Sequence, residues 1–220
     1  MQEYNLELTN GEKIPAGTMY CIGRNYSKHA KEMGAEVPEE PIVFLKPPTA
    51  MLCDGDKFEI PEFSNNVHHE VELVVVINKD CHKIEKSDAS SYILGVGVGL
   101  DFTLRDVQQI AKDKGLPWAV AKAFAGSSPI SKIIPFDSLN KKIEELEISL
   151  DVNNVQKQSE KISAMERSTE DLIYYLSKVF KLRRGDIVFT GTPEGVGQVH
   201  SGDKLCAKLD NLLDLNIEII

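Results

Sequence analysis

The stretch HHEVELVVVI (residues 68–77) decides the fold, because an apolar, β-branched run directly follows two histidines and two glutamates. Such a run is typical of a strand inside a sheet. Side chains alternate between the two faces of a strand, so Glu70 and Glu72 are predicted to share a face. Both faces become apolar beyond Glu72, which predicts that the strand is buried on both sides.

Two buried glutamates need compensation, because neighbouring buried carboxylates cannot both stay ionised without it. Lys or Arg side chains could pair with them, one carboxylate could hold a proton, or a divalent cation could lie between them. The simpler alternative is a strand end at which both side chains reach solvent or basic partners. The stretch itself leaves these possibilities open.

A second apolar run, ILGVGVGLD (93–101), ends in Asp101. If the two strands are neighbours, a third carboxylate reaches the same end of the sheet. Three oxygen ligands without a thiolate favour Mg²⁺ or Mn²⁺ over Zn²⁺. His68 and His69 are interpreted as hydrogen-bonding support for the carboxylates in preference to ligands.

The rest of the chain shows many short strand patterns and few helices, which predicts an α+β, strand-rich fold. The length suits one domain over residues 1–220, within which residues 1–50 could form a small N-terminal subregion. Ser168 is expected to cap the clearest helix. Expected helices cover 25–34, 103–115 and 168–180, and expected hairpins cover 4–14, 146–160 and 204–220.

Composition narrows the function classes. The net charge is −9 and no basic tract occurs, which argues against a general nucleic-acid binder. No apolar stretch approaches the roughly 18 residues of a membrane helix, and residues 1–13 have no apolar segment of a signal peptide. The four cysteines form no CxxC pair, so neither a disulfide framework nor a zinc knuckle is expected. Reduced thiols suit a cytoplasmic protein.

His29 and Glu32 form a second constellation, three residues apart in the expected helix 25–34. They share a helix face, and a carboxylate that holds one imidazole nitrogen leaves the other free as a base. Taken alone, the pair is more often an ordinary solvated helix pair. A short helix near an active site can also act as a lid.

Polar residues that could hold a substrate follow Asp101 and lie in a glycine-rich stretch. Arg105 and Gln108 are three residues apart on the helix after Asp101 and could bind a carboxylate, although surface solvation is the commoner explanation. The stretch TGTPEGVG (190–197) lacks the spacing of a nucleotide-binding loop. It is better explained as a turn that presents backbone N–H groups and the Thr192 hydroxyl to a small anion.

Six stretches together resemble the fumarylacetoacetate hydrolase family. They are GRNYSKHAKEM (23–33), FLKPPTA (44–50), HHEVEL (68–73), GLDFTLRDVQ (99–108), GLPWAVAKAF (115–124) and GDIVFTGTPEGVG (185–197). The set is highly specific and spans most of the chain in the family's order. The compact length and the stretch 115–124 are most similar to the short acylpyruvase and oxaloacetate decarboxylase branch. The segment 136–167 carries no motif.

The resemblance implies a mixed, rolled β-sheet fold, a homodimer and one Mg²⁺ or Mn²⁺ per subunit. It also implies roles for individual residues. These are metal ligands at Glu70, Glu72 and Asp101, a dyad of His29 and Glu32 on a mobile lid, a lysine beside the substrate at Lys122, and substrate contacts at Arg24, Arg105, Gln108 and Thr192.

The function implied by the resemblance is metal-dependent cleavage of a C–C bond in a small 2-oxo acid. Acylpyruvate hydrolysis and oxaloacetate decarboxylation both pass through a pyruvate enolate held by the metal. Isomerase or hydratase chemistry on 2-hydroxy-dienedioates shares that enolate and stays an alternative. A catalytically silent protein that binds a structural cation such as Ca²⁺ is the alternative from another class.

Overall fold

The computed structural model describes residues 4–220. Residues 1–3, part of the expected domain and of the N-terminal stretch discussed above, lie outside the described residues. Twenty-two helices and strands in residues 4–220 follow the order β1 Asn5–Glu7, β2 Lys13–Pro15, β3 Met19–Gly23, α1 Ser27–Glu32, β4 Ile42–Lys46, β5 Met51–Cys53, β6 Lys57–Phe58, β7 Val67–His69, β8 Val71–Ile77, β9 Ile93–Leu100, β10 Thr103–Leu104, α2 Arg105–Asp113, α3 Ala119–Lys122, β11 Ser128–Ile130, β12 Ile134–Pro135, β13 Glu147–Val152, β14 Val155–Lys161, α4 Thr169–Val179, β15 Ile187–Phe189, β16 Gly197–Gln198, β17 Lys204–Leu209 and β18 Leu213–Ile219.

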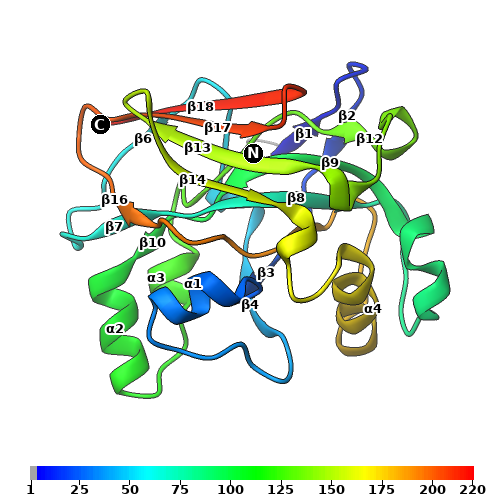
Figure 1. Ribbon diagram of the computed structural model, residues 1–220, viewed down its shortest axis with the longest axis horizontal. Coiled ribbons are helices and arrows are strands. Elements are labelled where there is room, and N and C mark those ends of the chain that lie inside the picture. Colours follow the sequence, from blue (N-terminus) through cyan, green and yellow to red (C-terminus); the bar gives the residue numbers. More distant parts are fainter. Residues whose placement is uncertain (1–3) are drawn as a thin grey trace.

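Two large sheets form the body of the molecule. The central sheet has the strand order β4-β3-β15-β8-β9-β11-β5, with β12 paired to β9, and mixes parallel and antiparallel neighbours. The second sheet has the order β14-β13-β17-β18-β6. Figure 1 shows β17 and β18 at one side of the molecule and the helices α1 to α4 at the opposite side. The α+β, strand-rich class expected from the sequence is confirmed.

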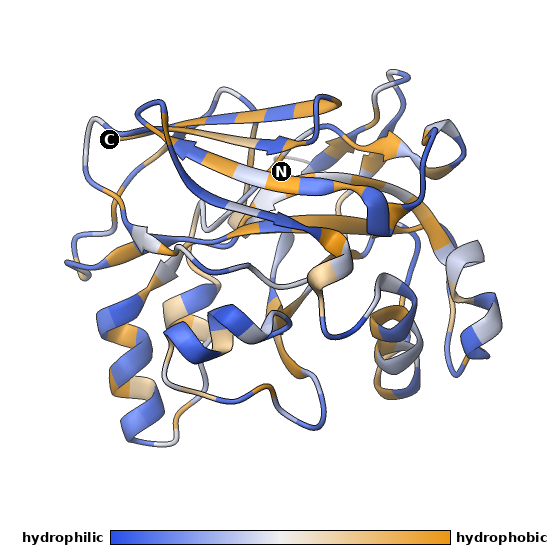
Figure 2. Ribbon diagram, viewed as in Figure 1, coloured by the Kyte–Doolittle hydropathy of each residue, from blue (hydrophilic) through white to orange (hydrophobic). Residues whose placement is uncertain are grey.

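The strand β8 lies in the middle of the central sheet and is buried along its whole length. Its side chains alternate between two apolar clusters, as the sequence predicts. Leu73 and Val75 join the cluster between the two large sheets, whereas Val74 and Val76 join a second cluster on the other face. Figure 2 shows hydrophobic residues concentrated in the strands, while α1 is largely hydrophilic.

One difference from the sequence prediction concerns the stretch 68–77, which is expected to be a single strand. The chain breaks at Glu70 into β7 and β8. β7 pairs with β10 and β16 in a separate three-stranded sheet, so the two strands belong to different sheets. The break turns Glu70 away from a regular ladder position and places it at the junction of the two sheets.

Turn and capping residues behave largely as expected. Asn153 and Asn154 both have positive φ and join β13 to β14, and Gly34 and Gly115 end their helices with positive φ. The Ser168 side chain accepts a hydrogen bond from the Asp171 N–H at the start of α4. In the expected hairpin over 4–14, Gly11 has positive φ and Asn10 does not, because residues 8–12 form a loop longer than a two-residue Asn-Gly turn.

The early part of the chain contributes to the central sheet. β3 pairs with β15 and β4 pairs with β3, so strands before residue 50 continue the sheet that contains β8.

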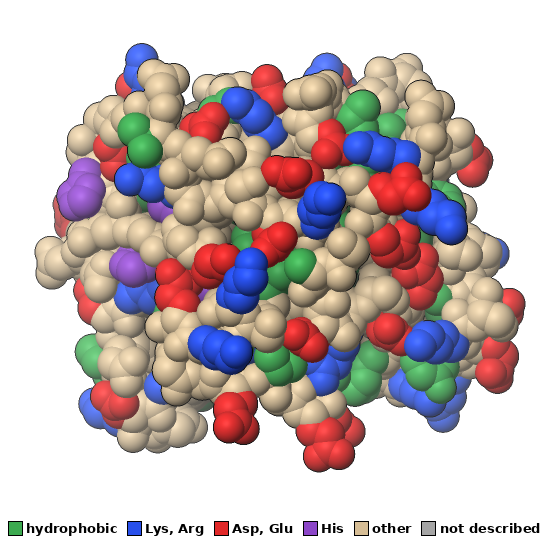
Figure 3. Space-filling model, in the orientation of Figure 1, with side chains coloured by type: hydrophobic (Ala, Val, Ile, Leu, Met, Phe, Trp, Pro, Cys, Tyr) green, Lys and Arg blue, Asp and Glu red, His purple; other side chains and the backbone are tan. Residues whose placement is uncertain are grey.

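Acidic and basic side chains are interspersed on the face of the molecule seen in Figure 3. Within the part of the chain that the structure describes, no helix combines the length and apolar character needed to cross a membrane.

Glycines in β9 let neighbouring strands approach its backbone, and Gly95 gives a testable case. A Cβ atom at Gly95 would lie 2.3 Å from the Ile134 carbonyl oxygen, which is a backbone atom of β12. The substitution Gly95→Ala is therefore expected to destabilise the protein by about 2–3 kcal/mol, measured by denaturant unfolding. Gly23→Ala is the matched control in a strand, because its Cβ would meet Ile42 at an ordinary 3.5 Å. Equal stability of both variants would contradict the close-approach explanation.

Candidate metal centre and active site

Three buried carboxylates meet where β8 begins and β9 ends. Glu72 lies opposite Gly99 in the antiparallel ladder, and the Asp101 N–H donates to the Glu70 carbonyl oxygen at 2.8 Å. One oxygen from each of Glu70, Glu72 and Asp101 lies within 4.8 Å of the others. The exposed fractions of the three residues are 4%, 2% and 1%. The neighbouring strands that the sequence argument required are therefore present.

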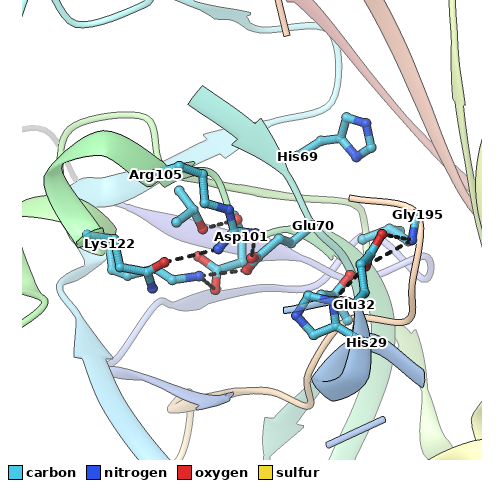
Figure 4. Close-up of polar contacts among 12 residues, drawn as sticks. His29, Glu32, His69, Glu70, Asp101, Arg105, Lys122 and Gly195 are labelled. Carbon is cyan, nitrogen blue, oxygen red and sulfur yellow. Dashed lines mark hydrogen bonds and ion pairs between the residues drawn. The ribbon is translucent and has the colours of Figure 1, made fainter. Parts of the chain in front are cut away.

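Three cationic side chains surround the carboxylates. The Lys122 ammonium group donates to Glu70 at 2.6 Å and to Asp101 at 2.7 Å, and the Arg105 guanidinium group pairs with Glu70. The Lys46 ammonium group lies 2.6 Å from the other Asp101 oxygen and donates to the Ser127 carbonyl oxygen. Figure 4 shows Lys122 and Arg105 directed toward Glu70 and Asp101.

The carboxylates differ in their electrostatic surroundings. Burial opposes ionisation of Glu70, but Arg105 and Lys122 hold its pKa well below the usual value. Burial, followed by the charges of Asp101 and Glu70, raises the pKa of Glu72 well above its usual value. Glu72 accepts a hydrogen bond from the Gly191 N–H at 2.7 Å. Among residues 4–220, no cationic side chain forms an ion pair with Glu72.

This arrangement fits a divalent cation. The donor set consists of carboxylate oxygens, which suit Mg²⁺ or Mn²⁺ and not a thiolate-bound metal. A cation between the three carboxylates would give Glu72 the positively charged partner that it lacks and would reduce the repulsion between the neighbouring carboxylates. Glu70, Glu72 and Asp101 would hold it, on strands whose apolar remainder fixes them in place.

The pair of His29 and Glu32 lies at the opposite side of the carboxylates from Lys122 (Figure 4). Glu32 faces the His29 Nδ1 atom at 3.2 Å and accepts from the Gly195 N–H at 3.1 Å. His29 is buried, with 6% of its surface exposed. The carboxylate partner assigns the imidazole proton to Nδ1, so Nε2 is free to accept one.

Further contacts hold α1 in this position. Lys28 forms ion pairs with Glu160 on β14 and with Glu194 in the glycine-rich stretch. The buried Asn25 amide donates to the Thr190 and Arg167 carbonyl oxygens. These ion pairs and hydrogen bonds connect α1 and Asn25, which precedes it in the chain, to β14 and to the glycine-rich stretch.

One cavity collects nine of the ten residues that the sequence singled out. It is lined by Arg24, His29, Glu70, Glu72, Asp101, Arg105, Gln108, Lys122 and Thr192, and Glu32 is reached through His29. Arg105 donates to the Gln108 amide oxygen at 3.1 Å. Arg24 has a positive φ of 60°, a strained conformation for a residue with a side chain.

This cavity is small, about 40 Å³, because lysine and arginine side chains converge on the carboxylates. A larger cavity of about 580 Å³ lies beside β1, β5 and β11. That cavity is lined by surface charged side chains such as Lys132, which pairs with Glu7. Among its described lining residues, no buried charged side chains converge. Chemistry and burial, not volume, identify the smaller cavity as the candidate site.

Two residues that contact the candidate site residues or their neighbours were not predicted from the sequence. Lys46 ends β4 and is 1% exposed beside Asp101, and its signal is a lysine at the end of an apolar strand in the stretch FLKPPTA. Gln158 lies on β14, in a segment without any motif, and bonds His69 at 3.0 Å. The expectation that His68 and His69 hydrogen-bond the carboxylates is wrong, since neither does so within residues 4–220.

Comparisons with known proteins agree over nearly the whole chain. The family described as fumarylacetoacetate (FAA) hydrolase C-terminal matches residues 18–219. A relative from Escherichia coli (strain K12), oxaloacetate tautomerase YcgM, is 45% identical over 197 residues, which are 89% of this chain and 90% of that protein.

Two solved structures extend the comparison. Fumarylpyruvate hydrolase from Pseudomonas aeruginosa, in complex with Mn²⁺ and pyruvate, has a TM-score of 0.95 at 35% identity, covering 100% of this chain and 97% of that chain. The 5-carboxymethyl-2-hydroxymuconate delta-isomerase from Mycobacterium smegmatis has a TM-score of 0.82 at 26% identity, covering 100% and 98%. The three similar proteins carry the names of a tautomerase, a hydrolase and an isomerase.

Proposed function

The chain belongs to the fumarylacetoacetate hydrolase family, and on that premise we propose that it is a divalent-metal-dependent enzyme that forms the enolate of a small 2-oxo acid. Keto–enol tautomerisation of oxaloacetate is the reaction we favour, because the E. coli relative at 45% identity carries that name. The observation that carries the proposal is the buried His29, paired with the more exposed Glu32 and placed across one cavity from three carboxylates.

The metal would act as a Lewis acid that draws electrons toward the 2-keto oxygen. Glu70, Glu72 and Asp101 would hold it, and the remaining steps belong to side chains of this protein. Arg105 and Gln108 line the cavity and are suited to bind the substrate carboxylate. The Lys122 ammonium group is suited to stabilise negative charge on the enolate.

His29 would move the proton. Its Nε2 atom takes a proton from C3 of the substrate, the C–H electron pair becomes the C2–C3 double bond, and the 2-keto oxygen takes the negative charge. Return of that proton from the His29 imidazolium to the oxygen would complete the enol and restore the neutral imidazole, and the reverse steps return the ketone. Glu32 holds the Nδ1–H and stabilises the imidazolium that forms.

Cleavage of a C–C bond is the second candidate, supported by the similarity to fumarylpyruvate hydrolase. In acylpyruvate hydrolysis His29 would deprotonate a water that attacks the distal carbonyl, and the bond would break to leave pyruvate enolate. In oxaloacetate decarboxylation CO₂ leaves and the same enolate forms. One set of residues serves all three reactions, so turnover numbers must decide between them.

Two further alternatives remain as outcomes of the test. Isomerase or hydratase chemistry on 2-hydroxy-dienedioates has support from the M. smegmatis isomerase. A silent protein with a structural cation such as Ca²⁺ would have no use for a buried histidine, held by a glutamate, beside its site. The homodimer and the cytoplasmic location implied by the resemblance stay predictions, the first measurable by light scattering.

The test uses protein stripped with EDTA and then given Mg²⁺, Mn²⁺ or Ca²⁺. Oxaloacetate and acetylpyruvate are offered in parallel, and enol disappearance, substrate loss and pyruvate formation are followed against metal-only blanks. We expect Mg²⁺- or Mn²⁺-dependent tautomerisation of oxaloacetate. Comparison of kcat/KM for tautomerisation with kcat/KM for C–C bond cleavage of each substrate shows which reaction the protein prefers. Absence of turnover with either substrate would contradict the proposal and leave the dienedioate or the structural-cation alternative.

A further inference from the structure

A single glutamine on an exposed strand connects three parts of the site. Among the described residues 4–220, β14 pairs only with β13, at the edge of its sheet, and its side chains are otherwise exposed or half-exposed. Gln158 is the exception, with 1% of its surface exposed. A polar side chain buried on an exposed edge strand calls for a specific explanation.

The orientation of the Gln158 amide follows from two backbone groups. The Val71 N–H lies 3.0 Å from Oε1 and can only donate, whereas the Pro193 carbonyl oxygen lies 2.9 Å from Nε2 and can only accept. The two ends of the amide are therefore assigned without ambiguity. Oε1 also bonds the His69 Nδ1 atom, and Nε2 also bonds the Thr192 Oγ1 atom at 2.9 Å.

The direction of the last bond has a consequence for Thr192. Because Nε2 donates, the Thr192 oxygen accepts, and the single hydroxyl hydrogen must point elsewhere. Within residues 4–220 that hydroxyl donates to no other group. Thr192 is 3% exposed and lines the cavity with Arg105 and the carboxylates. The hydrogen is thus available to a ligand inside the cavity.

We propose that Gln158 is a positioning residue, which directs the Thr192 hydroxyl as a donor toward the carboxylate of the bound 2-oxo acid. The inference rests on the proposed function and deepens it. An anionic acceptor between Thr192 and Arg105 would receive a charge-assisted hydrogen bond from each. Gln158 would act through Thr192 and not touch the substrate itself.

β14 also supports the backbone of the glycine-rich stretch 190–197. A Cβ atom at Gly195 would lie 2.2 Å from the Lys157 carbonyl oxygen, so this stretch packs directly on the β14 backbone. Gly191 and Gly195 donate to Glu72 and Glu32 from either side of Thr192. β14 therefore supports a segment that contacts a candidate metal ligand, the lid and the cavity.

The substitution Gln158→Glu tests the direction of the bond. Glutamate has the same shape and can still accept from Val71, but it cannot donate to Thr192 and would accept the Thr192 hydroxyl hydrogen instead. We expect KM for oxaloacetate and the calorimetric Kd for pyruvate, with Mn²⁺ present, to rise on the order of 10-fold. Mn²⁺ affinity should stay near the wild-type value, and kcat should change less than KM.

The control is Gln156→Glu, the same change at an exposed position of the same strand. Thr192→Val removes the hydroxyl itself, and Thr192→Ser keeps it. The two variants test whether it donates to the ligand even if the Gln158→Glu variant does not fold. Valine should weaken pyruvate binding as Gln158→Glu does, and serine should restore it. In the double variant with Thr192→Val, Gln158→Glu should add little, because both changes remove one interaction.

Wild-type KM and pyruvate affinity in Gln158→Glu, or in Thr192→Val, would overturn the inference. A full Gln158→Glu effect in the Thr192→Val background would overturn it as well, since Gln158 would then act by another route. The wild-type protein separates this failure from that of the proposed function. If the wild type neither turns over nor binds these compounds, both the proposed function and the inference are contradicted. If the wild type is active and the variants are unchanged, only the inference is contradicted.

Discussion

Replacing His29 with alanine is expected to lower kcat by about 10²-fold or more, because the substitution removes the proposed proton acceptor. His29 lies across the cavity from the carboxylates, with its Nδ1 held by Glu32, and does not contact them in an ion pair. Mn²⁺ affinity, measured by calorimetry, should therefore stay close to that of the wild type. The measurement is steady-state oxaloacetate tautomerisation at saturating Mn²⁺.

The control for this prediction is His82→Ala, which removes an exposed histidine in the connection between β8 and β9, at the opposite end of these strands from Glu72 and Asp101. It should keep wild-type kcat. A less severe change, Glu32→Gln, leaves His29 in place but removes the carboxylate that orients it, so its kcat should lie between those of wild type and His29→Ala. Unchanged turnover in His29→Ala would exclude the pair from the mechanism and return it to the ordinary helix pair that its spacing alone suggests.

The central strand was predictable because its pattern has a single physical solution. Six consecutive positions from Val71 to Val76 alternate between two apolar clusters, apart from Glu72, and no surface position offers that environment. The carboxylate at Asp101 could be added because one apolar run begins with acids and the next ends in an acid, which brings these groups together if the two strands are antiparallel neighbours. The register Glu72 to Gly99 bears this out.

The break at Glu70 was not predictable from alternation, because a period-two pattern does not reveal which sheet a strand joins. β7 pairs with β10 and β16, which are two-residue strands too short to leave a periodic signal. The position of Lys46 depends on long-range packing, since its ammonium group reaches a carboxylate 55 residues later in the numbering (101 − 46). The lysine at the end of an apolar strand is a local signal, but local sequence does not reveal which carboxylate it contacts.

Gln158 shows a further limit. A glutamine among exposed residues looks like surface, and only the tertiary structure shows that Val71 and Pro193 fix both ends of its amide. Its role follows from hydrogen-bond accounting, which needs the partners' positions and not their identities alone. The site could thus be located from sequence, while the residues that orient its groups could not.

The substitution Glu72→Gln is expected to have opposite effects on the metal-free and the metal-bound protein. Glu72 is 2% exposed, forms no ion pair among residues 4–220, and lies beside two other carboxylates. Glutamine removes the cost of either burying a charge or binding a proton at this position, and it keeps an acceptor for the Gly191 N–H. After EDTA treatment the variant should be more stable than wild type by about 1 kcal/mol, a rise in Tm of about 3 °C for a chain of this size.

In the presence of metal the order should reverse. Mn²⁺ affinity should fall by roughly 10²-fold, because losing a ligand costs at least as much as losing its hydrogen-bonding support. The rise in Tm that a bound cation gives depends on the ratio of its concentration to Kd, so the variant should lose most of it at a concentration that saturates the wild type. Glu59→Gln, which removes an exposed carboxylate, should change neither Tm nor affinity.

The two halves of this prediction test separate statements. Wild-type Mn²⁺ affinity or full activity at low Mg²⁺ in Glu72→Gln would contradict the ligand assignment, whatever the stability. A metal-free variant less stable than wild type would instead show that Lys46, Lys122 and Arg105 already compensate all three carboxylates. The buried cluster would then be a balanced ion network, and the argument from an unpaired Glu72 to a divalent cation would lose its basis. Melting curves of both proteins with and without Mn²⁺ decide both points in one experiment.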